Sequence, residues 1–345
     1  MAATTNWQAD RESYLPDDDP FVMRGLVGDP LGEADYELVY RLLERQFKGP
    51  CLSVAGYRGV PMHVVVPAEW DGMPVVGISA EAFRNCESLV SIQMEESVEQ
   101  IEPFAFCGCK NLKTVELSWE LYRIEESAFE GCTALKHIEI PDSVCFIDSQ
   151  AFLGCDSLKT VDLPQSVEGI GDSAFAWCSA LESIDLSDVY EVGSEAFAWC
   201  TSLTTVNIER QPFGYPQWVE IGAFAFRECT ALEQVRIGRS GPNELGASAF
   251  AGCTALRTAV LGDGFSCLPR NVFKGCSALE SVEVGDDLEE ILDGAFAGCR
   301  SLRSFHVMFD SPYDDCEKQP VRLAQTEVAI APGAFAGCPA EVLAV

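Results

Sequence analysis

One short pattern repeats along most of the chain: a phenylalanine followed three residues later by a cysteine. Successive phenylalanines are 23, 23, 23, 23, 22, 29, 24, 23, 23 and 39 residues apart. A period in the twenties indicates stacked structural units, because each unit is too small to bury its own apolar side chains. The spacing therefore predicts a solenoid of about eleven coils. The pairs are Phe83/Cys86, Phe106/Cys109, Phe129/Cys132, Phe152/Cys155, Phe175/Cys178, Phe197/Cys200, Phe226/Cys229, Phe250/Cys253, Phe273/Cys276, Phe296/Cys299 and Phe335/Cys338.

Each period also predicts one strand. Residues 112–117 end in an apolar and polar alternation, which is typical of a strand with Val115 and Leu117 buried. A short helical or 3₁₀ segment is expected at residues 126–129, ended by Gly131. The strands of neighbouring coils should pair in parallel at about 4.8 Å, so that identical side chains stack on one another.

These residues carry a specific resemblance. The unit L-x-x-V-x-I-P-x-S-V-x-x-I-x-x-x-A-F-x-G-C is nearly intact at residues 135–155 and 158–178. It resembles the leucine-rich repeat of the BspA-like bacterial surface proteins, also called the Treponema pallidum type, over about residues 51–338. The resemblance implies an α/β leucine-rich-repeat solenoid, a right-handed curved superhelix with one short parallel strand per coil of about 23 residues. It also implies a family in which many members are exported adhesins or interaction proteins without catalytic residues.

The first 50 residues lie outside the repeat and divide into two parts. Residues 1–30 contain three consecutive aspartates and three prolines, which predicts an acidic, poorly ordered arm. Residues 31–50 predict a helix that caps the first coil of the solenoid at 51–345, with a partner-binding helix as the alternative. The apolar residues at helical spacing are Tyr36, Val39, Tyr40, Leu43 and Phe47.

The start of the chain bears on location. It has no basic segment followed by an apolar stretch, so we recognise no signal peptide. No run of about 18 apolar residues predicts a membrane-spanning helix. As written, the chain is expected in the cytoplasm, and the alternative is the cell surface or secretion by a non-classical route.

The charge of the chain restricts its partners. The net charge is −31. Nucleic acid is disfavoured as a partner because phosphate backbones need lysine and arginine stripes, and an anionic membrane is disfavoured for the same reason. The charge favours a basic protein partner or serves solubility alone. We expect a monomer.

Cysteine is frequent but regular in position. Eleven of the sixteen cysteines occupy one repeat position, which predicts buried, reduced thiols with a packing role. Cys107 and Cys109 are too close for the usual zinc pair, and no matching pair lies nearby. We therefore predict no metal site and no cofactor.

One outward strand position predicts a contact surface. In a curved solenoid such positions line the inner, concave face. Four consecutive coils carry a carboxylate there, which indicates a docking stripe for a cationic partner. Lysines three residues before three of these acids could neutralise them, which favours a solvated face instead. The column is Gln93, Glu116, Glu139, Asp162, Asp185, Asn207, Arg236, Val260, Glu283 and His306, and the lysines are Lys113, Lys136 and Lys159.

Two coils are longer than the others. Residues 209–220 interleave Phe213, Tyr215 and Trp218 with proline and glycine, and the excursion after Val307 contains Tyr313. Insertions in repeats map to loops on one edge, where rigid aromatic residues are good anchors for a partner. The alternative is that these aromatic residues fold back over the solenoid.

Catalysis has little support in the sequence. Only His63, His137 and His306 could act as bases at neutral pH, and none has a recognisable nucleophile or acid partner. We therefore predict a non-catalytic protein–protein interaction scaffold that presents an acidic concave strand face and aromatic edge loops. The alternatives are an exported adhesin for host matrix or other cells, and a glycan-binding protein that stacks sugars on Trp218 and Tyr215.

Overall fold

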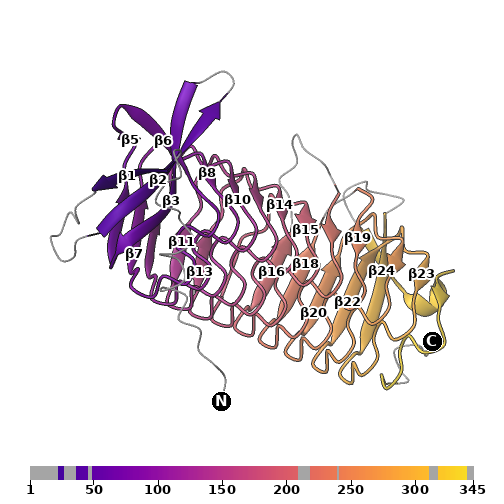
Figure 1. Ribbon diagram of the computed structural model, residues 1–345. Coiled ribbons are helices and arrows are strands. Elements are labelled where there is room, and N and C mark those ends of the chain that lie inside the picture. The colour runs from indigo at the N-terminus through magenta and orange to yellow at the C-terminus, as the bar shows by residue number, and fades with distance from the viewer. Residues whose placement is uncertain are drawn as a thin grey trace, which may run out of the picture.

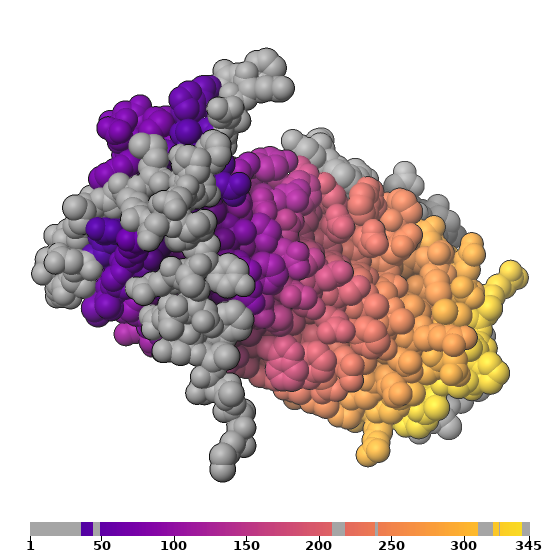
Figure 2. Space-filling view, in the orientation of Figure 1, coloured from indigo at the N-terminus to yellow at the C-terminus, as the bar shows by residue number. Residues whose placement is uncertain are grey.

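The computed structural model describes residues 22–26, 36–45, 49–208, 218–238, 241–310 and 318–339. These residues form an elongated stack of coils that runs from the first strands at one end to β23 (Glu290–Ile291) at the other (Figure 1). In the space-filling view the colour passes from indigo to yellow along the long axis, so successive parts of the chain follow one another along the stack (Figure 2). Equivalent residues of neighbouring coils pair, as Ile124 does with Ile147, 23 positions later. The predicted solenoid is confirmed.

One side of the stack, called the strand face here, carries the strands that the sequence predicts. They pair in parallel with matching registers, such as Ile138 opposite Val161. A single bridge between Thr160 and Ser183 extends the row beyond β13. The strands are β4 (His63–Val66), β7 (Ser91–Met94), β9 (Thr114–Glu116), β11 (His137–Glu139), β13 (Thr160–Asp162), β16 (Thr205–Ile208), β18 (Gln234–Ile237), β20 (Thr258–Leu261), β22 (Ser281–Gly285) and β24 (Ser304–Asp310).

A second strand row, which the sequence did not predict, follows another side of each coil. Most of its strands have two residues, one outward and one buried, as in β12 (Phe146–Ile147). The row comprises β3 (Gly49–Gly59), β6 (Met73–Ile78), β8 (Gln100–Ile101), β10 (Arg123–Ile124), β12, β14 (Gly169–Ile170), β15 (Glu191–Val192), β17 (Glu220–Ile221), β19 (Glu244–Leu245), β21 (Cys267–Leu268), β23 and β26 (Ala329–Ile330). The strand β5 (Glu69–Trp70) pairs antiparallel with β6.

The segments that contain the repeated phenylalanine are turns, so the helical segments expected there are wrong. The amide of Phe152 donates to the carbonyl of Ala174 on the next coil at 2.8 Å, whereas the amide of Leu153 donates to Gln150, three residues before it, at 3.0 Å. Because alternate amides pair with the next coil, no helix can continue. The only helix in the described ranges is the 3₁₀ turn Leu323–Gln325, so the α/β class becomes a β-solenoid. None of the described residues belongs to a helix able to cross a membrane.

The core consists of ladders that run along the whole stack. Consecutive phenylalanine rings stack 5.1–5.5 Å apart from Phe83 to Phe296, and Phe335 follows at 4.9 Å. Ten ladder cysteines donate a hydrogen bond from Sγ to a phenylalanine carbonyl of the preceding coil, as Cys155 does to Phe129 at 3.2 Å. That carbonyl also accepts the amide of Cys132. The thiol therefore satisfies the second lone pair of a buried carbonyl, which alanine could not do.

The predicted capping helix within residues 31–50 is wrong. Tyr36–Arg45 form the strand β2, which pairs antiparallel with β3 and with β1 (Val22–Leu26). Tyr36, Leu38 and Tyr40 are buried in the core at every second position, so these apolar residues follow the period of a strand. Tyr40 stacks on Trp70 at 5.5 Å. This antiparallel pair, seen at the indigo end of Figure 1, covers the first coil in place of a helix.

The other end has a matching device. In the longest coil, the strand β25 (Lys318–Arg322) pairs antiparallel with β24 and ends the parallel row of the strand face. The two antiparallel partners close different rows, since β2 covers the first strand of the second strand row and β25 covers the last strand of the strand face. Residues 1–21, most of the predicted acidic arm, lie outside the described residues.

Candidate protein-binding surfaces

The predicted acidic column lies on the strand face. Glu116, Glu139 and Asp162 occupy the same position in β9, β11 and β13, and all three are exposed. Glu139 is directly opposite Asp162. Asp185, two residues after the bridged Ser183, is exposed as well. We call these four residues the acidic row; adjacent members at about 5 Å repel by about 0.8 kcal/mol in water.

The neutralisation expected from the lysines differs in the structure. Lys159 Nζ lies 3.2 Å from Glu182 Oε1 rather than beside Asp162. The side chain beside Asp162 is instead His137, whose Nε2 lies 3.7 Å from Asp162 Oδ2 and carries a charge only when the ring is protonated. Asp185 accepts a hydrogen bond from the Ser187 amide at 3.0 Å. The acidic row therefore keeps most of its negative charge.

The same column changes character in the later coils. Asn207 is opposite Arg236, which is opposite Val260. Glu283 is opposite His306. Arg236 is exposed and His306 is half-buried. This part, called the mixed half here, has no continuous row of one charge.

The aromatic insertions are only partly described. Phe213, Tyr215 and Tyr313 lie outside the described residues. The Trp218 ring packs edge-on against Tyr190, with centroids 5.2 Å apart. Trp218 thus fits the alternative in which an aromatic residue folds back over the solenoid. The glycan-binding role of Trp218 and Tyr215 stays a prediction.

Two histidines have partners that the sequence did not reveal. His63 Nδ1 lies 2.8 Å from Ser91 Oγ. His137 Nδ1 lies 2.9 Å from Thr160 Oγ1, so the ring lies between a hydroxyl and the Asp162 carboxylate. The repeat register brings these residues together, because each pair is on adjacent strands. A hydroxyl, an imidazole and a carboxylate in a row are the groups of a nucleophile–base pair, which works in a site that excludes water. His137 and Asp162 are 52% and 66% exposed and therefore lack that setting.

An exposed aromatic stack was missed. Trp177 and Trp199 stack with centroids 4.5 Å apart and planes within 7°. The guanidinium of Arg227 lies 5.2 Å from the centre of the Trp199 ring. An alignment of the repeat units could have revealed this stack, since both tryptophans replace the glycine that precedes the ladder cysteine.

A second acidic row was also missed. Glu191, Glu220 and Glu244 are in register on adjacent strands of the second strand row, and all are exposed. The signal was a glutamate immediately before the buried residue of each short strand. This row has one carboxylate fewer than the acidic row and lies on a different side of the coils.

A hollow lies beside Arg123 on the second strand row. It has a volume of about 460 Å³ and is open to solvent. Arg123 lies over the Phe146 ring at 5.2 Å and pairs with Asp148 at 3.2 Å. Burial raises the pKa of Asp148, and burial followed by repulsion from Asp148 and Glu102 raises the pKa of Glu125. Among the described residues that line this hollow, Arg123 is the one cation, and it is already paired with Asp148.

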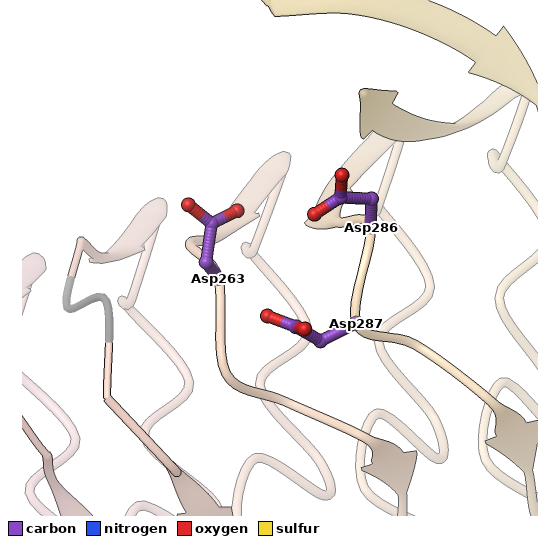
Figure 3. Close-up of side chains that lie close together, drawn as sticks. All are labelled: Asp263, Asp286 and Asp287. Carbon is purple, nitrogen blue, oxygen red and sulfur yellow. The ribbon is translucent and has the colours of Figure 1, made fainter. Parts of the chain in front are cut away.

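Three aspartates gather at one edge of the later coils. Asp287 points from its turn toward Asp263, and Asp286 lies beside them (Figure 3). Their carboxylate oxygens lie within 4.8 Å of one another. Asp287 Oδ2 accepts the amide of Gly264 at 2.7 Å, so this carboxylate also has a role in the turn. Exposed acidic groups often gather without a metal ion, and we assign no site to this cluster.

Most of the thiols with a shifted pKa are shifted upward, and Cys338 is the exception, because its hydrogen bond with the Cys299 thiol lowers its pKa. All fifteen described cysteines are free. Burial raises the pKa of the ladder thiol Cys155 to about 12. The pKa of Cys107, outside the ladder, rises to about 11 because of burial and the nearby Glu130 carboxylate. A nucleophilic or metal-binding cysteine needs the opposite shift of its pKa.

Comparison with known proteins agrees with this architecture. The model of the BspA type leucine-rich repeat region, in six copies, matches residues 76–204 and 191–313, more than half of the chain. No curated protein sequence matches the chain significantly.

Several solved structures are similar. A leucine-rich repeat protein from Bacteroides ovatus is 26% identical, with 79% of this chain and 81% of that chain covered and a TM-score of 0.46. A leucine-rich cell surface protein from Faecalibacterium prausnitzii is 24% identical, with 91% and 98% covered and a TM-score of 0.43. The leucine-rich repeat protein of T. pallidum is 23% identical, with 76% and 87% covered and a TM-score of 0.31. By the extent of the family match, this chain belongs to the BspA type leucine-rich repeat family.

Proposed function

We propose that the protein is a non-catalytic scaffold whose acidic row binds a basic surface of a partner protein. Leucine-rich-repeat solenoids are generally protein-interaction or surface scaffolds. The observation that carries the proposal is the alignment of Glu116, Glu139 and Asp162 on successive strands of one face. Asp185 continues the row on the next coil.

Mutual repulsion gives the acidic row its affinity for cations. The backbone ladder fixes the spacing of the Cα atoms, so rotation of the side chains relieves the repulsion only in part. A bound lysine or arginine side chain removes this repulsion, and the effect is severalfold stronger where a partner displaces water. The row is formed before binding, which lowers the entropy lost on association.

The test compares two charge-reversed variants of the full chain. One carries Glu116→Lys, Glu139→Lys, Asp162→Lys and Asp185→Lys. The matched control carries Glu191→Lys, Glu220→Lys, Glu244→Lys and Glu290→Lys, which change the net charge by the same amount on the second strand row. The probe is a decalysine peptide, titrated by calorimetry at about 50 and 300 mM NaCl, since screening weakens exposed pairs.

The first variant should lose at least tenfold in affinity, about 1.4 kcal/mol, and most of its salt dependence. The control should stay within about threefold of the unmodified protein, as expected for a change in overall charge alone. Equal losses in both variants would show that net charge, rather than the acidic row, attracts the peptide. Pull-downs with the same two variants then identify a natural partner as one lost only from the first.

Family membership favours an exported adhesin as the second candidate, because the family resemblance implies many such members. The same acidic row would then contact a matrix or cell-surface protein. Cell fractionation of the native protein decides between this candidate and the cytoplasmic expectation. Recovery in the medium or on the cell surface favours the adhesin, and recovery with cytoplasmic markers counts against it.

A further inference from the structure

Two tryptophans occupy a backbone position that is glycine in most coils. Seven coils have a glycine with positive φ immediately before the ladder cysteine, from Gly108 to Gly337. Trp177 and Trp199 hold the same position with φ of 64° and 61°. A left-handed backbone favours glycine, so a bulky side chain is kept there at a cost in stability. Asn85 and Glu228 also hold this position with positive φ, but only Trp177 and Trp199 place aromatic rings there, on adjacent coils.

The two rings begin a stack that continues along the axis of the solenoid. Trp177 lies on Trp199, and the Arg227 guanidinium of the next coil lies over Trp199. Arg227 also lies 5.5 Å from the Phe224 ring. Since Trp177, Trp199 and Arg227 come from successive coils, Trp199 is covered on both faces and Trp177 on one. Trp177 is 51% exposed.

The free face of Trp177 looks toward a coil without a side chain at this position. That coil has Gly154, where an added Cβ would meet no atom within 4 Å. Asp156, two residues later on the same coil, is exposed. The indole surface is therefore accessible, and a carboxylate belongs to the coil beside it.

We propose that the free face of Trp177 binds an arginine side chain of a basic partner protein. Tryptophan has the most favourable ring face for a cation, and Arg227 already makes this contact at the far end of the same stack. Asp156 and the net charge of −31 favour a cation over a neutral or acidic group. The inference rests on the proposed function, since it assumes a basic partner.

The Trp177 ring and part of the acidic row belong to the same coils. Trp177 lies between Asp162 and Asp185 in the chain, on the turn side rather than on the strand face. A partner that reaches around this edge would contact both surfaces. The two contacts are separable, because no residue is shared between them.

The decisive variant is Trp177→Gly, because glycine is the residue that most coils have at this position and this φ. The matched control is Trp119→Ala, which removes an unstacked indole that is 61% exposed. The probe is a deca-arginine peptide titrated into the full chain. Trp177→Gly should weaken binding about tenfold, the effect of losing a desolvated cation–π contact, and Trp119→Ala should leave it unchanged. The thermal midpoint of each variant establishes that it is folded.

A wild-type measurement keeps the proposal testable if Trp177→Gly does not fold. The indole N–H signal of Trp177, assigned with Trp177→Phe, should shift on titration with deca-arginine. An unchanged affinity or an unmoved signal would overturn the proposal. The proposal would also be overturned if Trp177 were required for binding to a glycan array but not for binding to the peptide. It would be overturned as well if the protein formed dimers that Trp177→Gly abolishes. If the four reversals on the acidic row abolish binding and Trp177→Gly does not, the proposed function stands and this inference fails.

Discussion

The acidic row and the mixed half lie over the same ladders of buried phenylalanine and cysteine and differ mainly in their exposed residues. In both, the phenylalanine rings stack at the same separation, and each ladder thiol donates to a carbonyl of the preceding coil. The outward position of the strand carries Glu139 and Asp162 in one part, but Arg236 and Val260 in the other. The buried positions thus specify the fold, and the exposed ones are free to specify a partner.

The largest expected effect tests whether the two interiors are equivalent. Phe152→Ala and Phe250→Ala each remove one fully buried ring from the ladder. Each should cost about 3–5 kcal/mol in the free energy of unfolding, through lost burial and the cavity left behind. Urea denaturation measures both losses. If one variant loses less than half as much free energy of unfolding as the other, the two interiors are not equivalent.

A smaller effect concerns the thiol ladder. Cys155→Ala and Cys276→Ala remove a hydrogen bond to Phe129 and to Phe250 and should each cost about 1–2 kcal/mol. Cys145→Ala, outside the ladder, is the control and should stay within about 0.5 kcal/mol. If all three variants lose the same amount in urea denaturation, the ladder thiols have no special role.

The mixed half should bind a basic peptide more tightly when its positive charge at Arg236 is reversed. Arg236→Glu places a carboxylate in the mixed half, opposite Asn207 and Val260. Affinity for decalysine should rise up to about fivefold, which corresponds to about 1 kcal/mol for one exposed ion pair. Val260→Thr, at the neighbouring position, is a neutral control. Weaker binding by Arg236→Glu in calorimetry would contradict the electrostatic account.

The smallest effect depends on pH. Burial, with repulsion from Asp148 and Glu102, raises the pKa of Glu125 in the folded state. A carboxyl whose pKa is raised by folding destabilises the protein once it is ionised, and the penalty disappears as pH falls below its ordinary value of about 4.3. Glu125→Gln should therefore raise stability at pH 7 by about 0.3 kcal/mol, after allowance for its partial exposure.

This difference should vanish near pH 4 when the midpoints of thermal unfolding are compared across the range. The neighbouring carboxylate allows a charge-matched control, Glu126→Gln. If Glu126→Gln raises stability at pH 7 by the same amount, the effect comes from the net charge rather than from the burial of Glu125 and its repulsion from nearby carboxylates.

The repeat period predicted the interior and the strand face because both depend on register alone. Once Phe129 is known to lie over Phe152, the outward Glu139 must lie beside Asp162. The second strand row escaped prediction because two-residue strands are too short to show an alternation. The capping helix was wrong because Tyr36 and Tyr40 fit both a helical and a strand spacing, and pairing with β3 decided between them.

For the site residues, too, the sequence predicted the position of each residue but not the contacts of its side chain. Register placed the acidic row, but the direction of a long side chain such as Lys159, which turns to Glu182, does not follow from spacing. The Trp177 and Trp199 stack could have been found by asking which coils lack glycine before the cysteine. The partner of a surface is harder to predict, because exposed positions are not constrained by packing.

The most direct test of the central claim is carboxyl footprinting of the full chain with and without N-acetylated deca-arginine, a basic peptide that has no amine able to couple to the activated carboxylates. The peptide should protect Glu116, Glu139, Asp162 and Asp185 from carbodiimide-coupled labelling and leave Glu283 of the mixed half and Glu220 of the second strand row unchanged. Protection spread evenly over these carboxylates, or confined to Glu220 and its neighbours, would contradict the claim that the acidic row is the contact surface.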